Sequence, residues 1–188
     1  AERRERGVGR GRGGRGPEAR MARRPTRAGP RGGGKRQILR EAYECFVRGR
    51  HYWEKRTEAD LVRAITEYKN ALDHDPTWAL PYCGLADVYM ALSGNEWWPP
   101  EHGYPKARAA AEAALNLGTG LAPAHAVIGV VKAFYDADWS GASKALAQAA
   151  ALDPALPNAP YWAGMVAMNL GRFDEAEALI RRASELAP

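Results

Sequence analysis

The chain contains few residues whose type and spacing could support catalysis or hold a metal ion. Its four histidines are scattered, and none has a second ligand at a spacing typical of metal sites: His51, His74, His102 and His125. The run GVGRGRGGRG has glycine spacings that resemble a phosphate-binding loop, but its charged context lacks a preceding strand. We therefore predict no enzymatic activity, no metal and no cofactor.

The two cysteines, Cys45 and Cys83, are far apart and outside any CxxC spacing. Free cysteine packs as a small apolar side chain, so we expect two buried thiols and a reducing compartment, the cytoplasm. No apolar run reaches the length of about 18 residues that a membrane-spanning helix needs, and the Arg-rich start lacks the apolar core of a signal peptide. The sequence thus predicts no membrane association.

Charge is distributed unevenly along the chain. Residues 1–36 carry 13 Lys or Arg and three Glu, a net charge of +10, whereas the whole chain has +5 and the remainder therefore −5. Gly, Pro and like charges leave this segment little to bury, so we predict a disordered Arg/Gly-rich tail over 1–36. The composition changes to Ala, Leu, Tyr and Trp at helical spacing near residue 37.

The tail supports an alternative function, nucleic-acid binding, because Arg with interspersed Gly can contact phosphates along an unstructured chain. It has no aromatic residue to stack on bases, and Met21 is an internal candidate for the true start. A linker or a mispredicted start is the competing interpretation. The chain begins without Met and ends directly after a helical pattern, which is typical of a fragment of a longer protein.

Four segments have similar sequences at their ends, each typical of the end of a helix, and this similarity indicates internal repeats. NALDHDP, AALNLGT, QAAALDP and RRASELAP end at positions 76, 119, 154 and 188, which are 43, 35 and 34 residues apart. We expect repeats over 42–76, 79–119, 122–154 and 157–188. The nine extra residues of the second repeat are placed in a loop around GNEWWPPEHGYP, because Gly, Asn and Pro are typical of irregular backbone.

These repeats resemble the tetratricopeptide repeat. In the second repeat, Tyr82, Leu85, Ala86 and Tyr89 match the pattern of the first helix, and Ala107 matches the small residue of the second. The resemblance implies an all-α fold, a tetratricopeptide-type α-solenoid of four helical hairpins forming a right-handed superhelical arc. An unrelated helical bundle is the alternative.

A narrower resemblance covers roughly residues 40–188. The run EAYECFVRGRHYWEKRTEADLVRAITEYKNALDHDPTWALPYCGLADVYMAL, with PPEHGYPKARAAAEAAL and AHAVIGVVKAFYDADWSGA, is similar to the tetratricopeptide region of multidomain bacterial signalling proteins. In those proteins it follows winged-helix regulatory, nucleotide cyclase or serine/threonine kinase domains, none of which is present here. The resemblance implies a regulatory or docking segment that binds a protein or peptide, or another domain of its parent.

Stacked hairpins line a concave face with their first helices, and this face is the expected peptide-binding groove. A mostly aromatic and apolar groove suits a hydrophobic segment or an amphipathic helix. Arg50 and Lys132 are candidate cations for a C-terminal carboxylate, but Asp87 lies between them, which disfavours that ligand. The candidate groove residues are Tyr43, Phe46, Arg50, Trp53, Cys83, Asp87, Met90, Val130, Phe134, Tyr161, Met165, Met168 and Asn169.

Some of these side chains have a second interpretation, packing inside the array or against a missing domain. Trp97 and Trp98 could anchor a partner, but we expect them to fold back over the joint between the second and third repeats. Asp138 and Trp139 are interpreted as a helix start with a packed ring. The last hairpin ends without a polar capping helix, which predicts an exposed apolar surface and self-association or a C-terminal extension.

Overall fold

The computed structural model describes residues 39–187, and these residues form eight α-helices and no strand. The predicted all-α fold is therefore confirmed. The predictions for the tail, residues 1–36, lie outside the described residues. The helices are α1 (Arg40–Glu54), α2 (Glu58–His74), α3 (Ala79–Gly94), α4 (Pro100–Leu117), α5 (Ala122–Phe134), α6 (Trp139–Leu152), α7 (Asn158–Asn169) and α8 (Phe173–Leu186).

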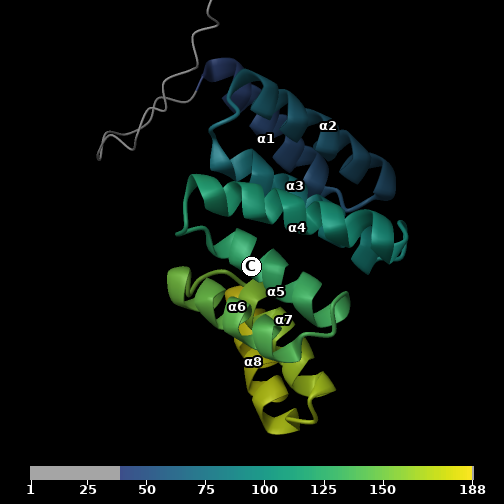
Figure 1. Ribbon diagram of the computed structural model, residues 1–188, viewed down its shortest axis with the longest axis vertical. Helices are drawn as coiled ribbons and strands as arrows, with labels where there is room; N and C mark the ends of the chain where they lie inside the picture. Colours follow the sequence, from purple (N-terminus) through teal and green to yellow (C-terminus); the bar gives the residue numbers. More distant parts are fainter. Residues whose placement is uncertain (1–38, 188) are drawn as a thin grey trace, which may run out of the picture. The chain divides into compact units, whose positions relative to one another are not determined.

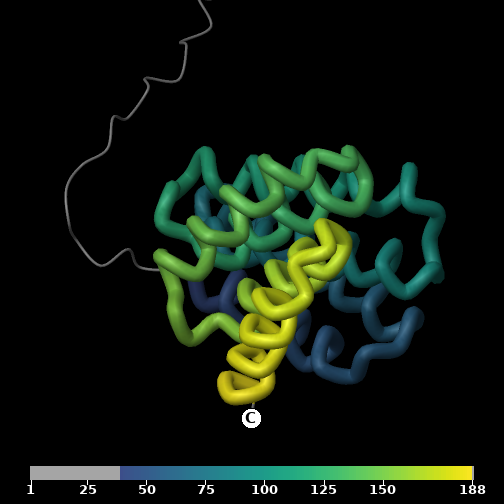
Figure 2. Tube along the Cα trace, turned by 90° about the horizontal axis from the view of Figure 1, so that it is seen from below, coloured from purple at the N-terminus to yellow at the C-terminus, as the bar shows by residue number. Residues whose placement is uncertain are grey.

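Consecutive helices pair as four hairpins, which stack one upon the next (Figure 1). The most extensive contacts are within the pairs α1 and α2, α3 and α4, α5 and α6, and α7 and α8. Each second helix then contacts the first helix of the following hairpin. Along the stack, α8 lies at an angle to the helices of the first hairpin (Figure 2). This arrangement is the solenoid that the repeat spacing predicts.

Local sequence explains where several helices begin and end. The Asp138 side chain caps α6 by accepting a hydrogen bond from the backbone N–H of Gly141 at 2.8 Å. Trp139 begins that helix and packs edge-on against Phe134, so the prediction of a helix start with a packed ring is confirmed. Gly171 follows α7 with φ of +73°, a left-handed conformation that glycine adopts without strain.

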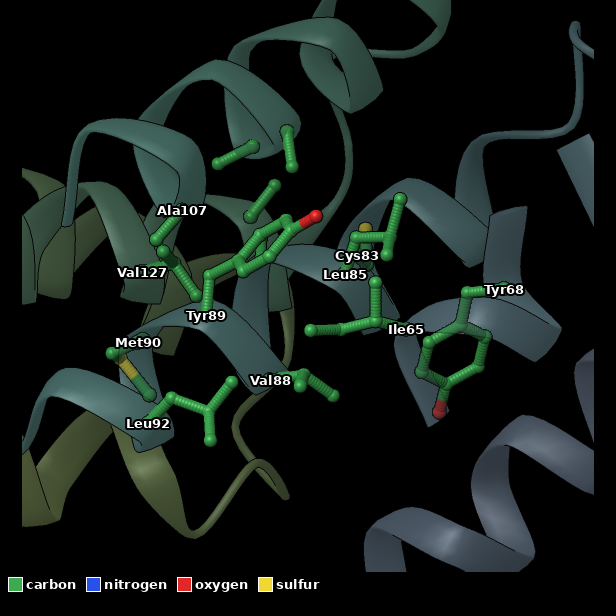
Figure 3. Packing of buried hydrophobic residues seen from close by; sticks show 14 of the residues in the cluster. Ile65, Tyr68, Cys83, Leu85, Val88, Tyr89, Met90, Leu92, Ala107 and Val127 are labelled. Atoms are coloured by element: carbon green, nitrogen blue, oxygen red, sulfur yellow. The ribbon is translucent and has the colours of Figure 1, made fainter. Parts of the chain in front are cut away.

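The main core lies where α2, α3, α4 and α5 meet (Figure 3). Small residues allow close approach: Ala86, Ala107 and Ala111 are fully buried. Larger side chains fill the remaining space, among them Leu92 and Tyr89. Burial of apolar surface across hairpin boundaries holds each repeat to its neighbours, because one hairpin alone cannot cover its own apolar face.

The insertion in the second repeat differs from the expected loop. Helix α3 extends to Gly94 and α4 begins at Pro100, so much of GNEWWPPEHGYP is helical. Proline suits the first position of a helix, because its φ is already close to helical and its missing N–H would have no helical partner there. The irregular backbone is limited to residues 95–99. The Pro and Gly content alone therefore overestimated the loop.

Gly103 allows the start of α4 to lie directly against α3. A Cβ atom built at this position would lie 2.0 Å from Ser93 Oγ and 2.7 Å from the backbone oxygen of Tyr89. Gly103→Ala is expected to lower the free energy of unfolding by about 1–3 kcal/mol, because the helices must move apart. Chemical denaturation measures this change. Gly120→Ala is the control, because nothing lies within 4 Å of its Cβ position, and an equal loss in both variants would contradict the prediction.

Candidate functional site

The first helices of the four hairpins lie next to one another along one face. Helix α3 contacts both α1 and α5, and α5 contacts α7. In the described part of the chain, the second helices α2, α4, α6 and α8 make no comparable contacts with one another. Side chains from four separate repeats can therefore meet on the face formed by α1, α3, α5 and α7.

Three adjoining cavities open along this face, and together we call them the groove. Their volumes are about 310, 250 and 70 Å³. Trp53 lines the first two, and Asp87 and Pro123 line the first and the third. Met90 and Trp162 are shared by the second and the third. These shared walls place the three cavities side by side along α1, α3, α5 and α7.

Most of the predicted groove residues line these cavities. Eight of them do so: Phe46, Arg50, Trp53, Cys83, Asp87, Met90, Val130 and Tyr161. They come from all four first helices, so the structure brings together residues that are more than 100 positions apart in the sequence. Their role in binding remains a prediction.

The other predicted residues lie outside the three cavities. Tyr43 is 54% exposed and stacks on Trp78, with ring centroids 6.3 Å apart. Phe134 is partly buried and packs against the rings of Trp139 and Trp162. The remaining three, on α7, are partly buried or exposed and line no cavity of the groove: Met165, Met168 and Asn169.

The structure also adds groove residues that the sequence did not indicate. Arg56 follows α1 in a left-handed conformation, with φ of 54°, and its guanidinium lies 3.8 Å from the centre of the Trp53 ring. Tyr68 reaches the groove from α2, and Trp162 from α7. A repeat count places only first-helix positions on the concave face, so it could not identify a turn residue or a second-helix residue. Trp162 directly follows the predicted Tyr161, and its large side chain was the one available signal.

Asp87 is the one acidic residue among the described residues that line the groove. Its side chain is partly buried, and burial raises the pKa of this carboxyl to about 7, with Arg56 acting in the opposite direction. Burial and the Asp87 charge also raise the pKa of the Cys83 thiol to about 12 and raise the pKa of the Tyr68 hydroxyl. Several ionisable groups of the groove are thus biased toward their neutral forms.

The basic side chains near the groove already have partners. Arg50 pairs with Glu54 at 3.9 Å, and both side chains are 63% exposed. Lys132 lies 3.2 Å from Asp138, at the start of α6, and lines no cavity of the groove. Arg50 and Lys132 therefore do not converge within the groove, as a clamp for a terminal carboxylate would require.

Apolar side chains are also exposed away from the groove. Phe173 is 69% exposed at the start of α8, and a separate cavity of about 200 Å³ lies between α6, α7 and α8. The apolar surface expected on the last hairpin is thus present, whereas self-association remains a prediction.

The two tryptophans between α3 and α4 differ in their packing. Trp98 folds back against Tyr89, with ring centroids 6.1 Å apart, but Trp97 stays 39% exposed.

Metal ligands do not gather anywhere in the described residues. Residues 39–187 contain no group of three or more His, Cys, Asp or Glu placed to hold a metal ion. Cys45 and Cys83 are both buried free thiols, as predicted. None of the eight helices in this part of the chain combines the length and the apolar character that crossing a bilayer requires.

Part of the repeat region matches a known protein family. The family model described as tetratricopeptide repeat matches residues 133–188. The chain is also 23% identical over 143 residues to the transcriptional regulator HilA of Salmonella typhimurium and of Salmonella typhi. That match covers 76% of this chain but 26% of HilA, so the chain spans about a quarter of these curated relatives.

Solved structures show the same fold. A thermophilic TPR protein of Thermus thermophilus is similar with a TM-score of 0.65 and 22% identity, covering 79% of this chain and 75% of that one. The first TPR of Spaghetti (RPAP3), bound to an HSP90 peptide, has a TM-score of 0.56 and 18% identity. That match covers 70% of this chain and 94% of the other. At these identities the likeness supports the fold.

Proposed function

We propose that this chain, which matches the tetratricopeptide-repeat model over residues 133–188 and has the fold of such repeats, binds a segment of another protein in the groove along α1, α3, α5 and α7. The observation that carries the proposal is the row of three adjoining cavities, whose neighbours share the wall residues Trp53, Asp87, Met90 and Trp162. A row of adjoining cavities suits successive side chains of an extended or helical segment, whereas a single isolated pocket would suit a small molecule. The Spaghetti structure, a TPR with a peptide bound, supports a peptide ligand for this fold.

The walls of the groove suit such a segment. Phe46, Trp53, Met90 and Trp162 provide large apolar and aromatic surfaces, and aromatic side chains are frequent anchors of protein interfaces. Methionine adds an adaptable contact, because its unbranched side chain fills irregular gaps. The proposed role is docking, without catalysis.

We further propose that the repeats serve a regulatory protein. The similarity to the transcriptional regulator HilA supports this role. In such a protein, the groove would hold either a separate partner or a segment of the same parent chain. No DNA-binding activity is transferred to these repeats.

Trp53→Ala tests the groove directly. A displayed library of random peptides, each about 12 residues long, is selected against the whole chain, and affinities of the enriched peptides are measured by fluorescence anisotropy. Trp53 lines two cavities, so its loss is expected to weaken binding about tenfold or more. Phe173→Ala is the matched control, because this aromatic side chain is exposed and lies outside the groove. Equal affinities of both variants and the unmodified protein would refute the groove as the binding site.

A further inference from the structure

Asp87 lies where two cavities of the groove meet. It comes from α3, near the middle of the stack, and lines both the 310 Å³ and the 70 Å³ cavity. The other walls at this point are mainly aromatic or apolar, including Phe46, Trp53 and Trp162. The Asp87 carboxylate can therefore contact a ligand that occupies either of these two cavities.

This carboxylate has no partner within residues 39–187. No hydrogen bond or ion pair to another described side chain involves Asp87, although Arg56 is close enough to influence its charge. No side-chain oxygen or nitrogen in the described residues is both sealed from solvent and without a hydrogen bond. The Asp87 oxygens are therefore accessible from the cavities, where an incoming group can reach them.

The neighbouring cations do not neutralise Asp87. Arg50 pairs with Glu54, and the Arg56 guanidinium lies over the Trp53 ring. An ionised carboxylate among apolar walls is poorly solvated, and a cation with hydrogen-bond donors is the group that best compensates for the lost water. The side chains of Lys and Arg combine such a head with an aliphatic stem, and the stem suits aromatic walls.

We infer that the groove selects a protein segment that carries one Lys or Arg among apolar residues, with the basic head on Asp87 and its stem against Trp53 and Trp162. This inference rests on the proposed function and specifies its ligand. An acidic ligand would place like charges together at Asp87. An entirely apolar ligand would leave the carboxylate without a partner and without water.

The same peptide library tests the inference with the whole chain. Lys or Arg is expected to be enriched at one position of the peptides whose binding depends on Trp53. Replacing that residue by norleucine should weaken binding to the unmodified protein about tenfold, because a desolvated charge pair is lost. With Asp87→Asn, the Lys and norleucine peptides should bind with nearly equal affinity. Glu101→Gln is the control, since it removes the same charge from an exposed position on α4.

The outcomes separate the inference from the proposed function. If peptides bind in a Trp53-dependent way without any basic preference, or with a preference for Asp or Glu, the groove stands and the role of Asp87 is refuted. If no peptide is enriched above the Trp53→Ala background, both proposals fail.

Binding of the Lys peptide should also strengthen from about pH 5.5 to about pH 8, because the ionised fraction of Asp87 increases across its pKa of about 7. A pH-independent affinity would contradict the contact.

Discussion

Tyr68→Ala is expected to lower the free energy of unfolding by about 3–5 kcal/mol, the cost typical of removing a buried aromatic ring. Tyr68 is 2% exposed and belongs to α2, but its ring fills the space between α1 and α3. Cβ atoms built at Gly49 and Gly84 would lie 2.6 Å from ring atoms of Tyr68, so both helices approach the ring as closely as glycine allows. Without the ring, the first two hairpins lose one of the contacts that hold them together.

Chemical denaturation measures this loss, and Tyr68→Phe is the matched control. The Tyr68 hydroxyl makes no hydrogen bond to another described residue, so Phe is expected to change stability by less than about 1 kcal/mol. A loss below about 1 kcal/mol for the alanine variant would show that the neighbouring side chains collapse into the space. In that case Tyr68 would not contribute substantially to holding the first two hairpins together.

Asp87→Asn is expected to stabilise the protein at about pH 8 by about 1–3 kcal/mol, because it removes a charge that the folded state solvates poorly. The folded pKa of about 7 lies above the ordinary value of 3.8. Between these two values the folded state binds more protons than the unfolded state, so the free energy of unfolding decreases as pH rises. The destabilisation is complete above about pH 8 and absent below about pH 4.

Urea denaturation at a series of pH values measures this effect. The difference between Asp87→Asn and the unmodified protein should grow from about pH 4.5 to about pH 8 and then level off. The charged and titratable groups that face Asp87 are Arg50, Arg56, Tyr68 and Cys83, and among them Arg56 opposes the shift. Glu101→Gln removes the same charge from an exposed position on α4, and equal growth in this control would show that the effect is not specific to Asp87. A constant difference for Asp87→Asn across this range would mean that the folded carboxyl keeps its ordinary pKa.

The two results for Asp87 would together describe a compromise between stability and binding. The same substitution is expected to stabilise the free protein and to weaken its hold on a basic segment. Active and binding sites often retain groups that lower the stability of the free protein in this way. A side chain that served only packing would not produce opposite changes in the two measurements.

Much of the fold follows from local sequence. The spacing of NALDHDP and its equivalents predicted four hairpins, and the small residues Ala86 and Ala107 predicted where helices cross closely. Asp138 predicted the start of α6, since a side chain that caps a helix acts within one turn of the chain. The repeat count also placed Trp53, Asp87, Met90 and Tyr161 on one face, and these residues do line the groove.

The sequence by itself determined the helices and the face that each presents, because these depend on contacts within one or two turns or one repeat. Only the tertiary structure decided the groove, because its cavities depend on how side chains from four repeats fill the space between helices. Arg56 lines the groove because the chain adopts a left-handed conformation at this residue after α1. Phe134 lies outside the groove because its ring packs against Trp139 and Trp162. The elevated pKa of Asp87 likewise arises from burial by residues of other helices, which no local pattern records.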